Sequence, residues 1–327
     1  MEVEDVLSRM HVHLREQCPW LPAEAVELHP FLSDTYNALL GETHRAQHLP
    51  PHTACVLLLT TPHFFEGVRR MVRATASSSP HPSTRVQQKG EAVTSTRVQK
   101  GEVPKDPVDW VCRVVVEGVA GASGDAACQW HMEGDMREGT VRREPVILVQ
   151  QMGHAAGATF LYHPRLLQEG EGGGADEEEE DEDEEEEGPA LHCGVCVHPR
   201  WGGWFVFRGC VVLPGCAVGS PASPPEDVLR WDCAGGQGEW RRRVRALLRA
   251  FHGEWRSGVW RGMMGSPRRQ PEARYDPEQF LYFHTYDTRV RQAYCRLLML
   301  QGQQQQEAGG GSGSGCAPHS VEEEDAL

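Results

Sequence analysis

Apolar residues in the first part of the chain follow two different spacings. Between residues 3 and 15 they recur every three or four positions, which predicts a helix with one buried face. Residues 54–61 are almost all apolar and predict a short buried strand, and a second helix is expected to begin at Pro62. A strand between two helices indicates a mixed fold in this part of the chain.

The segment after residue 105 allows two interpretations. Asp106, Pro107 and Asp109 are typical of a helix start, with a capping side chain, a proline in the first turn and an acid close behind. The β-branched residues between 111 and 116 favour a strand instead. We predict a helix, because one helical face would carry Val108, Val111, Cys112, Val115 and Val119.

The middle of the chain contains strand-like runs separated by small residues. Residues 145–150 predict a strand, and the small residues at 152–159 would let another backbone or a flat ligand approach closely. Two more strand-like runs, 194–198 and 204–213, flank a turn-like segment at 199–203. We predict that these two runs form a β-hairpin.

Helical spacing returns near the C-terminus. Asp276 and Asp287 are predicted to begin two helices, the second of which runs to Leu300. The predicted architecture is α+β, with a mainly antiparallel sheet flanked by helices. A further helix before these two, with arginines on its solvated side, is predicted from the spacing of Trp240, Val244, Leu247, Leu248, Phe251, Trp255 and Val259.

Three segments have too few apolar residues to offset the entropy of ordering. They are residues 76–104, which contain a near-duplicated polar phrase, residues 168–190 and residues 302–327. We therefore expect one domain over residues 1–300, with disordered inserts at about 76–104 and 168–190, followed by a disordered acidic tail over residues 301–327.

The net charge of −15 is concentrated in one place. Residues 176–187 are an unbroken run of twelve acids, so the rest of the chain carries a formal charge of only −3. A near-neutral body gives no electrostatic reason to expect DNA or RNA as a partner. The acidic run itself is typical of a solvated insert that repels itself.

The sequence favours an intracellular protein. Residues 1–5 are acidic where a signal peptide needs basic residues, and no apolar run is long enough to span a bilayer. The eleven cysteines are an odd number scattered along the chain, which suits reduced thiols better than a set of disulfides. We expect a cytoplasmic location and no membrane partner.

A short pattern with the residue types of a zinc or redox site spans residues 192–198. It places Cys193 and Cys196 three positions apart, between His192 and His198. On a strand, however, the two cysteine side chains point to opposite faces and cannot share a metal. No second cysteine pair of this spacing exists to complete a four-ligand site, so we expect ordinary buried thiols and assign no metal ligand.

An arginine is predicted in apolar surroundings. Strand alternation would place Arg208 on one face with Trp204, Val206, Cys210 and Val212, where a guanidinium needs an anionic partner. An internal salt bridge and a ligand contact both remain open for this side chain. The same question applies to the arginines at positions 256 and 261.

His154 stands between Gly153 and Ala155 in the segment of small residues. A metal ligand, a proton donor and a core histidine bonded to backbone are the alternatives, and we expect the last. The chain contains no nucleotide-binding glycine fingerprint, phosphate loop or nucleophile elbow. The residues alone therefore indicate no more than an α+β domain with a candidate ligand cleft.

Taken in order, these phrases resemble one family, the methylmalonic aciduria and homocystinuria type C proteins. The most specific phrase is Gly194-Val-Cys-Val-His-Pro-Arg-Trp-Gly-Gly-Trp204, which is followed by Arg208-Gly209. The resemblance covers most of residues 18–72, 106–163 and 193–300. Other matching phrases are Cys18-Pro-Trp20, Asp106-Pro-Val-Asp109, Ile147-Leu-Val-Gln150, His154-Ala-Ala-Gly-Ala158, Trp255-Arg256 and Arg274-Tyr275.

The resemblance implies a cobalamin-processing enzyme and chaperone with a flavin-nitroreductase-like α+β fold. Its large cavity would hold cobalamin base-off, with the lower ligand detached from cobalt. The upper ligand would be removed in two ways: as cyanide, with electrons from FAD or FMN and indirectly from NADPH, or by transfer of an alkyl group to glutathione. A downstream cobalamin-trafficking protein of the type D family is the implied partner. A binding-only escort protein without chemistry is the alternative.

The resemblance also assigns site residues by position, but no catalytic residue. The implied glutathione site contains Arg208, Arg261 and a third arginine near Arg289 or Arg291. Gly258 departs from the family, which has a tryptophan there, so the contact with the upper face of the ligand is expected to differ. The implied cobalamin contacts are Ile147, Leu148, Val149, Gln150, His154, Leu161, Tyr162, His163, Cys196 and Phe207.

Overall fold

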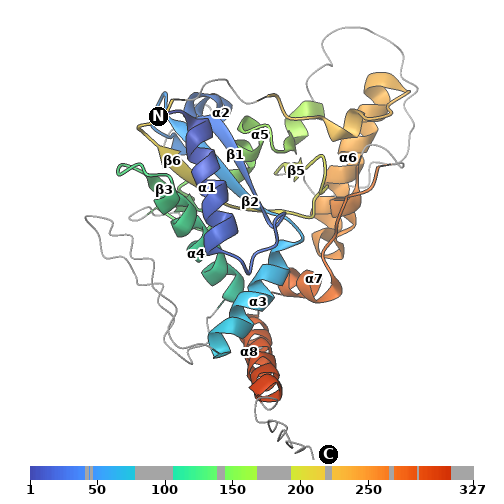
Figure 1. The fold of residues 1–327 in the computed structure, drawn as a ribbon. Helices are drawn as coiled ribbons and strands as arrows, with labels where there is room; N and C mark the ends of the chain where they lie inside the picture. The colour runs from blue at the N-terminus through green and yellow to red at the C-terminus, as the bar shows by residue number, and fades with distance from the viewer. Residues whose placement is uncertain are drawn as a thin grey trace, which may run out of the picture.

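A computed structural model describes residues 1–40, 44, 47–77, 106–137, 144–167, 193–217, 223–264, 269–285 and 287–310 (Figure 1). The predicted inserts and most of the predicted tail lie outside these residues, so the expected division of the chain stays a prediction. Within the described ranges, no helix has both the length and the apolar composition that crossing a membrane requires.

The centre of the fold is a four-stranded antiparallel sheet with the strand order β1-β2-β6-β3. Every residue of β2 is buried, as its apolar run predicts, because the strand lies inside the sheet and both sheet faces are covered. The predicted class of a mainly antiparallel sheet flanked by helices is confirmed. The strand bounds are Val26–Leu32 for β1, Ala54–Thr60 for β2, Val206–Leu213 for β6 and Gln129–Met132 for β3.

Helices α1, α3 and α4 cover one face of this sheet, and α8 packs against α3 (Figure 1). Together with alternate residues of β2 and β6 they enclose a first hydrophobic cluster. The predicted helix at residues 3–15 is confirmed, because α1 buries Val3, Val6, Met10 and Leu14 at helical spacing. The helix bounds are Val3–Gln17 for α1, Phe64–Ser77 for α3, Pro107–Ala122 for α4 and Thr288–Gly310 for α8.

The start of α4 decides between helix and strand for the segment after residue 105. The Asp106 carboxylate accepts hydrogen bonds from the backbone N–H groups of Val108 and Asp109, at 3.0 and 3.1 Å. Pro107 occupies the first helical position, where its missing N–H costs nothing. The β-branched valines are accommodated because their common face is buried against the sheet. The prediction of a helix is therefore confirmed.

Two further clusters lie beyond the first. Helices α2, Ser33–Leu40, and α5, Val149–Ala155, enclose a second cluster on the opposite face of the sheet. The short strands β4, Phe160–Tyr162, and β5, Val195–Val197, form a separate two-stranded sheet that packs with α6, Gly236–Glu254, around a third cluster. The candidate functional residues lie where these clusters meet.

The strand predicted at residues 145–150 is wrong, because α5 already begins at Val149. The N–H of Leu148 donates to the hydroxyl of Tyr36 at 3.0 Å instead of to a neighbouring strand. The helix brings Gly153 so close to Phe207 that an added Cβ would lie 2.5 Å from the aromatic ring. This close packing of small residues selects the helix over the strand.

The predicted hairpin of residues 194–198 and 204–213 is also wrong. β5 pairs with β4, whereas β6 pairs with β2 and β3, so the two strands belong to different sheets. A bridge between His198 and Gly202 closes the loop between them, with backbone hydrogen bonds of 2.8 and 2.9 Å. Gly202 has a φ of 59°, a left-handed conformation that turns the chain toward the central sheet.

The helix predicted from the spacing of Trp240 to Val259 is shorter in the structure. α6 ends at Glu254, short of the predicted end, and two 3₁₀ turns follow, η4 at Trp255–Ser257 and η5 at Val259–Gly262. Gly258 separates the two turns with a φ of 70°, a conformation that few other residues adopt. The chain therefore changes direction where a continuous helix is predicted.

The two predicted helix starts near the C-terminus are confirmed. α7 spans Pro277–His284, and Asp276 caps it by accepting a backbone hydrogen bond of 2.8 Å from its first turn. Asp287 accepts a bond of the same length at the start of α8, which continues beyond its predicted end at Leu300.

Helix α2 and strands β1, β3 and β4 are not predicted from the sequence. β1 contains Pro30, which breaks the strand pattern but is tolerated because β1 is an edge strand that pairs on one side only. α2 and β3 are eight and four residues long, too short for their spacing to stand out.

Asp106 joins α4 to α7 and α8, because its carboxylate also accepts from the Tyr282 hydroxyl and pairs with Arg291. We expect Asp106→Ala to lower the free energy of unfolding by about 3 kcal/mol, since two helix N–H groups, a phenol and a guanidinium lose their acceptor. Asp106→Asn should cost less, because the amide oxygen can still cap the helix. Urea unfolding followed by circular dichroism measures both variants, and equal losses would contradict the capping role.

Candidate functional site

Most of the residues predicted to contact cobalamin come together around α5, β4 and β5. α5 packs against both strands of the small sheet and against β6. Ile147 and Phe207 are buried, and Leu148 and Val149 pack beside them in the second cluster. The fold thus gathers residues from separate segments of the chain into one region, which we call the α5 region.

Gln150 and Cys196 link α5 to β5. The Gln150 amide donates to the carbonyl of Gly194 at 3.1 Å, and the Cys196 thiol donates to the carbonyl of Gln150 at 3.6 Å. Burial raises the pKa of Cys196 to about 12, so the thiol stays protonated at neutral pH. A protonated thiol is a poor nucleophile, so Cys196 is not a candidate for nucleophilic catalysis.

His154 is bonded to the backbone, which confirms the expectation of a core histidine. Its Nδ1 accepts the N–H of Leu161 at 3.2 Å, and its ring packs edge-on against Phe160 with 5.2 Å between ring centres. Since Nδ1 is an acceptor, the imidazole proton resides on Nε2. Burial lowers the pKa of His154, so the neutral form with an Nε2–H donor is favoured.

Tyr162 points away from the other predicted contacts. Its hydroxyl donates to Asp227 at 2.8 Å and accepts the N–H of Leu229 at 2.9 Å, inside the third cluster. Leu161 and His163, on either side of it, remain partly exposed. The Tyr162 side chain therefore lies apart from the other predicted cobalamin contacts. Only its backbone, which pairs with Val195 of β5, belongs to the α5 region.

The predicted face of Arg208 is wrong, because β6 contains a β-bulge at this position. The pairing of β2 with β6 shifts by one residue between Leu58 and Leu59, which leaves Arg208 as the extra residue. On β6, the alternation of side chains between the two sheet faces therefore does not continue through Arg208. Cys210 faces the second cluster, whereas the Arg208 guanidinium lies on the opposite side of the sheet, 5.8 Å from the ring centre of Phe64.

Arg208 is a buried cation with an unused donor. Its side chain is 7% exposed, and its Nε donates to the hydroxyl of Thr60 at 3.0 Å. Among the residues that the structure describes, it forms no ion pair and its Nη2 has no hydrogen-bond partner. Burial disfavours the charge, but Cys112, Glu133 and Asp109 nearby keep the pKa of Arg208 above its ordinary value. No ion pair to Arg208 is found among the described residues, although Glu133 and Asp109 act on its charge, and the ligand contact stays a prediction.

Arg261 and Arg208 both lie close enough to Tyr275 for their charges to act on its hydroxyl. The Arg261 guanidinium carbon is 5.3 Å from the ring centre of Tyr275 and 4.5 Å from that of Trp260, and its Nη1 donates to the Gly203 carbonyl. Burial raises the pKa of Tyr275, and the charges of Arg261 and Arg208 act against this rise. Both predicted arginines therefore surround a tyrosine that has no periodic signal in the sequence.

The third predicted arginine does not join this group. Arg291 pairs with Asp106 and donates twice to the carbonyl of Thr285, at 3.1 and 2.9 Å, so its guanidinium supports α8. Arg289 is exposed in the first turn of that helix. We call the region of Arg208, Arg261 and Tyr275 the arginine pocket.

Phe280 occupies the space beside Gly258. A Cβ added to Gly258 would lie 2.5 Å from the Phe280 ring, and the φ of 70° disfavours any larger residue. The Phe280 ring stacks on His284 at 3.9 Å and lies 6.1 Å from Trp204, measured between ring centres. An aromatic side chain from α7 thus stands next to the position where the family has a tryptophan.

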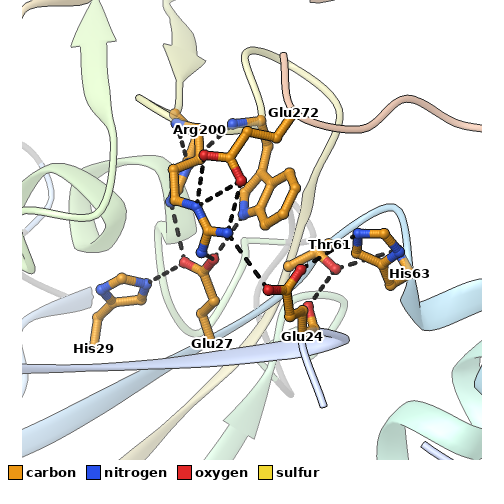
Figure 2. A network of polar contacts seen from close by, with 9 residues as sticks. Glu24, Glu27, His29, Thr61, His63, Arg200 and Glu272 are labelled. Carbon is orange, nitrogen blue, oxygen red and sulfur yellow. Dashed lines mark hydrogen bonds and ion pairs between the residues drawn. The ribbon is translucent and has the colours of Figure 1, made fainter. Parts of the chain in front are cut away.

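A polar network joins β1 to the loop between β5 and β6 (Figure 2). The Glu27 carboxylate accepts hydrogen bonds from His29 at 3.0 Å, from His198 at 3.1 Å and from the Trp201 indole at 2.7 Å. Arg200 lies 3.7 Å from Glu27 and bridges it to two other carboxylates. The loop is therefore held to the edge of the sheet by one buried acceptor.

Glu27, His29 and His198 have the spacing of a metal site, since their ligand atoms lie within 4.8 Å of one another. The Nδ1 of His198, however, accepts the backbone N–H groups of Arg200 and Trp201, at 3.1 and 3.3 Å. The remaining proton of the neutral ring therefore sits on Nε2, the atom that would have to bind the metal. The cluster is better described as a hydrogen-bonded support of the loop.

The two cysteines at 193 and 196 lie in different environments. Cys193 is exposed and its carbonyl accepts a hydrogen bond from His252 at 3.0 Å, whereas Cys196 is buried in the second cluster. His192 lies outside the described residues. That the pair binds no zinc stays a prediction.

The charge of Glu27 depends on these hydrogen bonds. Burial alone would raise its pKa, but hydrogen bonds from His198, His29 and Trp201 outweigh burial and hold the pKa far below the ordinary 4.5. A carboxylate with a depressed native pKa stabilises the fold above its unfolded pKa and loses that contribution as the pH falls below it.

We therefore expect Glu27→Gln to lower the free energy of unfolding by about 2 kcal/mol at neutral pH, because buried donors lose a charged acceptor. The difference between wild type and variant should be complete above about pH 5 and shrink as the pH falls further. Urea unfolding at a series of pH values measures it. A difference that stays constant down to pH 3 would contradict the low pKa.

Comparison with known proteins gives further findings. A sequence model of the methylmalonic aciduria and homocystinuria type C family matches residues 25–293. A Mus musculus protein named cyanocobalamin reductase / alkylcobalamin dealkylase is 30% identical over 274 residues, which cover 82% of this chain and 75% of that protein. The Bos taurus protein of the same name is 28% identical over 268 residues, with the same shares covered.

Among solved structures, a C. elegans B12-trafficking protein, CblC, has a TM-score of 0.60 and 23% sequence identity to this chain. The match covers 89% of this chain and 97% of the C. elegans chain. At this identity the likeness shows the fold alone, and it agrees with the mixed helical and antiparallel architecture.

Proposed function

Because the chain belongs to the methylmalonic aciduria and homocystinuria type C family, we propose that it binds cobalamin and removes its upper ligand. Curated relatives are named for two such activities, cyanocobalamin reductase and alkylcobalamin dealkylase. The proposal includes base-off binding, a flavin-nitroreductase-like fold, a cytoplasmic location and a chaperone role that delivers cobalamin to a protein of the type D family.

The arginine pocket is the observation that supports this function best. A guanidinium buried without an ion pair is costly, and such groups are normally paired or bound to a ligand. Arg208 and Arg261 both have buried nitrogens without partners in the part of the chain that the structure describes. Glutathione supplies carboxylates that would pair with them, and it also supplies the thiol that dealkylation requires.

The α5 region is the proposed cobalamin face. The corrin ring carries amide side arms. These can form hydrogen bonds with backbone groups at residues 147–150 and with the side-chain amide oxygen of Gln150. His154 would offer its Nε2–H to the same ligand. Leu148, Val149 and Leu161, which are partly exposed beside the buried Ile147 and Phe207, supply the apolar surface on which a flat ring can lie.

In the proposed dealkylation, the glutathione thiolate attacks the alkyl carbon that is bound to cobalt. A carbon–sulfur bond forms, the cobalt–carbon bond breaks, and its electron pair stays on cobalt as cob(I)alamin. The protein's part is to orient the tripeptide and to favour the thiolate by placing positive charge nearby. Arg208 and Arg261 supply this charge, and the Cys196 thiol takes no part because it is protonated.

In the proposed decyanation, cobalt(III) gains one electron and becomes cobalt(II), while cyanide leaves with the bonding pair. Reduced FAD or FMN supplies the electron, and NADPH renews the flavin indirectly. Detachment of the lower ligand makes cobalt easier to reduce, so the cavity assists the reaction by holding cobalamin base-off. We assign no residue to the flavin.

We expect the purified full-length protein to shift the absorption spectrum of cyanocobalamin to the base-off form, and reduced FMN or FAD to convert it further to the cobalt(II) form. Absence of any shift would contradict cobalamin binding. A shift without conversion by reduced flavin, and without dealkylation of methylcobalamin by glutathione, would favour the alternative of a binding-only escort protein.

We expect Arg208→Ala to weaken glutathione-dependent dealkylation of methylcobalamin by about 2–5 kcal/mol in transition-state stabilisation, the cost of leaving a buried charge unpaired. Flavin-driven decyanation should change much less. Arg208→Lys should restore the rate only in part, because an ammonium group lacks the planar fork of a guanidinium. Steady-state rates of both reactions on the same preparations measure these effects.

The melting temperature of Arg208→Ala provides the control. Since the described residues contain no ion pair to Arg208, its removal should lower the melting temperature little. Equal losses in both reactions together with a clearly lowered melting temperature would show that the arginine supports the fold instead.

A further inference from the structure

Several buried hydrogen-bond donors without partners gather at the arginine pocket. They are the Nη2 of Arg208, the Nε of Arg261, the hydroxyl of Tyr275 and the indole N–H of Trp204. Arg208 comes from the bulge of β6, Arg261 from η5, Trp204 from the loop before β6 and Tyr275 from the residues before α7. Four separate parts of the chain therefore bring unused donors to one place.

The contacts among these side chains show that they are neighbours. The Trp204 and Tyr275 rings meet edge to face with 5.3 Å between centres, and the Arg261 guanidinium carbon lies 5.3 and 5.9 Å from the Tyr275 and Trp204 ring centres. Arg208 approaches from the other side, 5.6 Å from the Phe283 ring, which itself lies 5.1 Å from the Tyr275 ring.

Other buried tyrosine hydroxyls in the described ranges are hydrogen-bonded. Those of Tyr36, Tyr162 and Tyr282 contact the Leu148 N–H, Asp227 and Asp106 respectively. A buried donor without an acceptor costs about 1–3 kcal/mol, and native proteins leave few of them. Tyr275 therefore stands out as a hydroxyl whose acceptor comes from outside the chain.

The acceptor that fits this pocket is an anion. The Arg261 guanidinium carbon lies 5.3 Å from the Tyr275 ring centre, and Arg208 is close enough for its charge to oppose the rise in the pKa of Tyr275. Asp109 and Glu133 act on Arg208 from a distance, but among the described residues neither forms an ion pair with it, so its Nη2 still lacks an acceptor. A carboxylate is planar and offers about four lone-pair positions on two oxygens, enough for two guanidinium donors and a phenol.

We propose that Tyr275 is a further binding residue for the thiol co-substrate, and that its hydroxyl donates a hydrogen bond to the glutathione carboxylate held by Arg208 and Arg261. The Trp204 indole N–H serves the same group from the edge of the pocket. This inference rests on the proposed glutathione-dependent reaction, but it concerns a residue that the resemblance to the family does not assign.

Tyr275→Phe tests the inference, because it removes the hydroxyl and keeps the ring contacts. Titration calorimetry of the full-length variant with glutathione should show a dissociation constant raised about tenfold, the effect of one lost hydrogen bond to a charged group. With the diethyl ester of glutathione, which has no carboxylate, wild type and variant should bind alike. The free energy of unfolding without ligand should stay the same or rise, since an unsatisfied donor is removed.

Tyr282→Phe is the matched control, because the Tyr282 hydroxyl has its acceptor inside the protein at Asp106. It should lower the stability of the free protein and leave the glutathione affinity unchanged, the reverse of the Tyr275 pattern.

The outcomes separate this inference from the proposed function. Unchanged glutathione affinity in Tyr275→Phe, an equal loss for acid and ester, or a loss of folding stability would each overturn the role of Tyr275 and leave the reaction intact. If wild type itself binds no glutathione, the glutathione-dependent reaction fails, and the inference fails with it.

Discussion

The Glu27 carboxylate holds the loop on which both candidate regions depend. It binds the fully buried Trp201 of the loop between β5 and β6, and so fixes the point where the chain passes from the small sheet to the central one. Within the same loop, the Gly203 N–H donates to the Arg261 carbonyl at 2.7 Å. The loop that Glu27 supports is therefore also hydrogen-bonded to the backbone of Arg261.

The sequence predicts an element when the spacing of its own apolar residues or its own capping residue identifies it. It does not predict a feature whose conformation depends on contacts with distant parts of the chain. α1 and the caps of α4 and α7 follow from spacing and from Asp106 and Asp276. The bulge at Arg208 arises from the pairing of β6 with β2, so a single strand read alone gives the wrong face. Tyr275 lies outside any regular element. It belongs to a phrase that matches the family, but only the hydroxyl without a partner in the structure indicates a binding role. Strand alternation and the resemblance to the family both point to Arg208, and the resemblance also assigns Arg261.

Phe280 fills the space beside Gly258, the position at which the resemblance implies a tryptophan. The left-handed backbone there permits Phe280 to come so close that no side chain would fit at position 258. Phe280 also stacks on His284 and lies near Trp204, which borders the arginine pocket. α7 therefore places an aromatic ring beside position 258, close to one of the side chains of the arginine pocket.

The Glu27 network and the arginine pocket differ in whether their buried donors have acceptors within the protein. Around Glu27 each strong donor has its acceptor, so the network stabilises the free protein and leaves little for a ligand to gain. In the arginine pocket, buried donors lack acceptors among the described residues, which weakens the free protein. A ligand that supplies the missing acceptor binds the folded state only, so its binding energy adds to the stability of the fold. In the proposed function, these donors remain unpaired in the free protein because their acceptor is supplied by a separate molecule, glutathione.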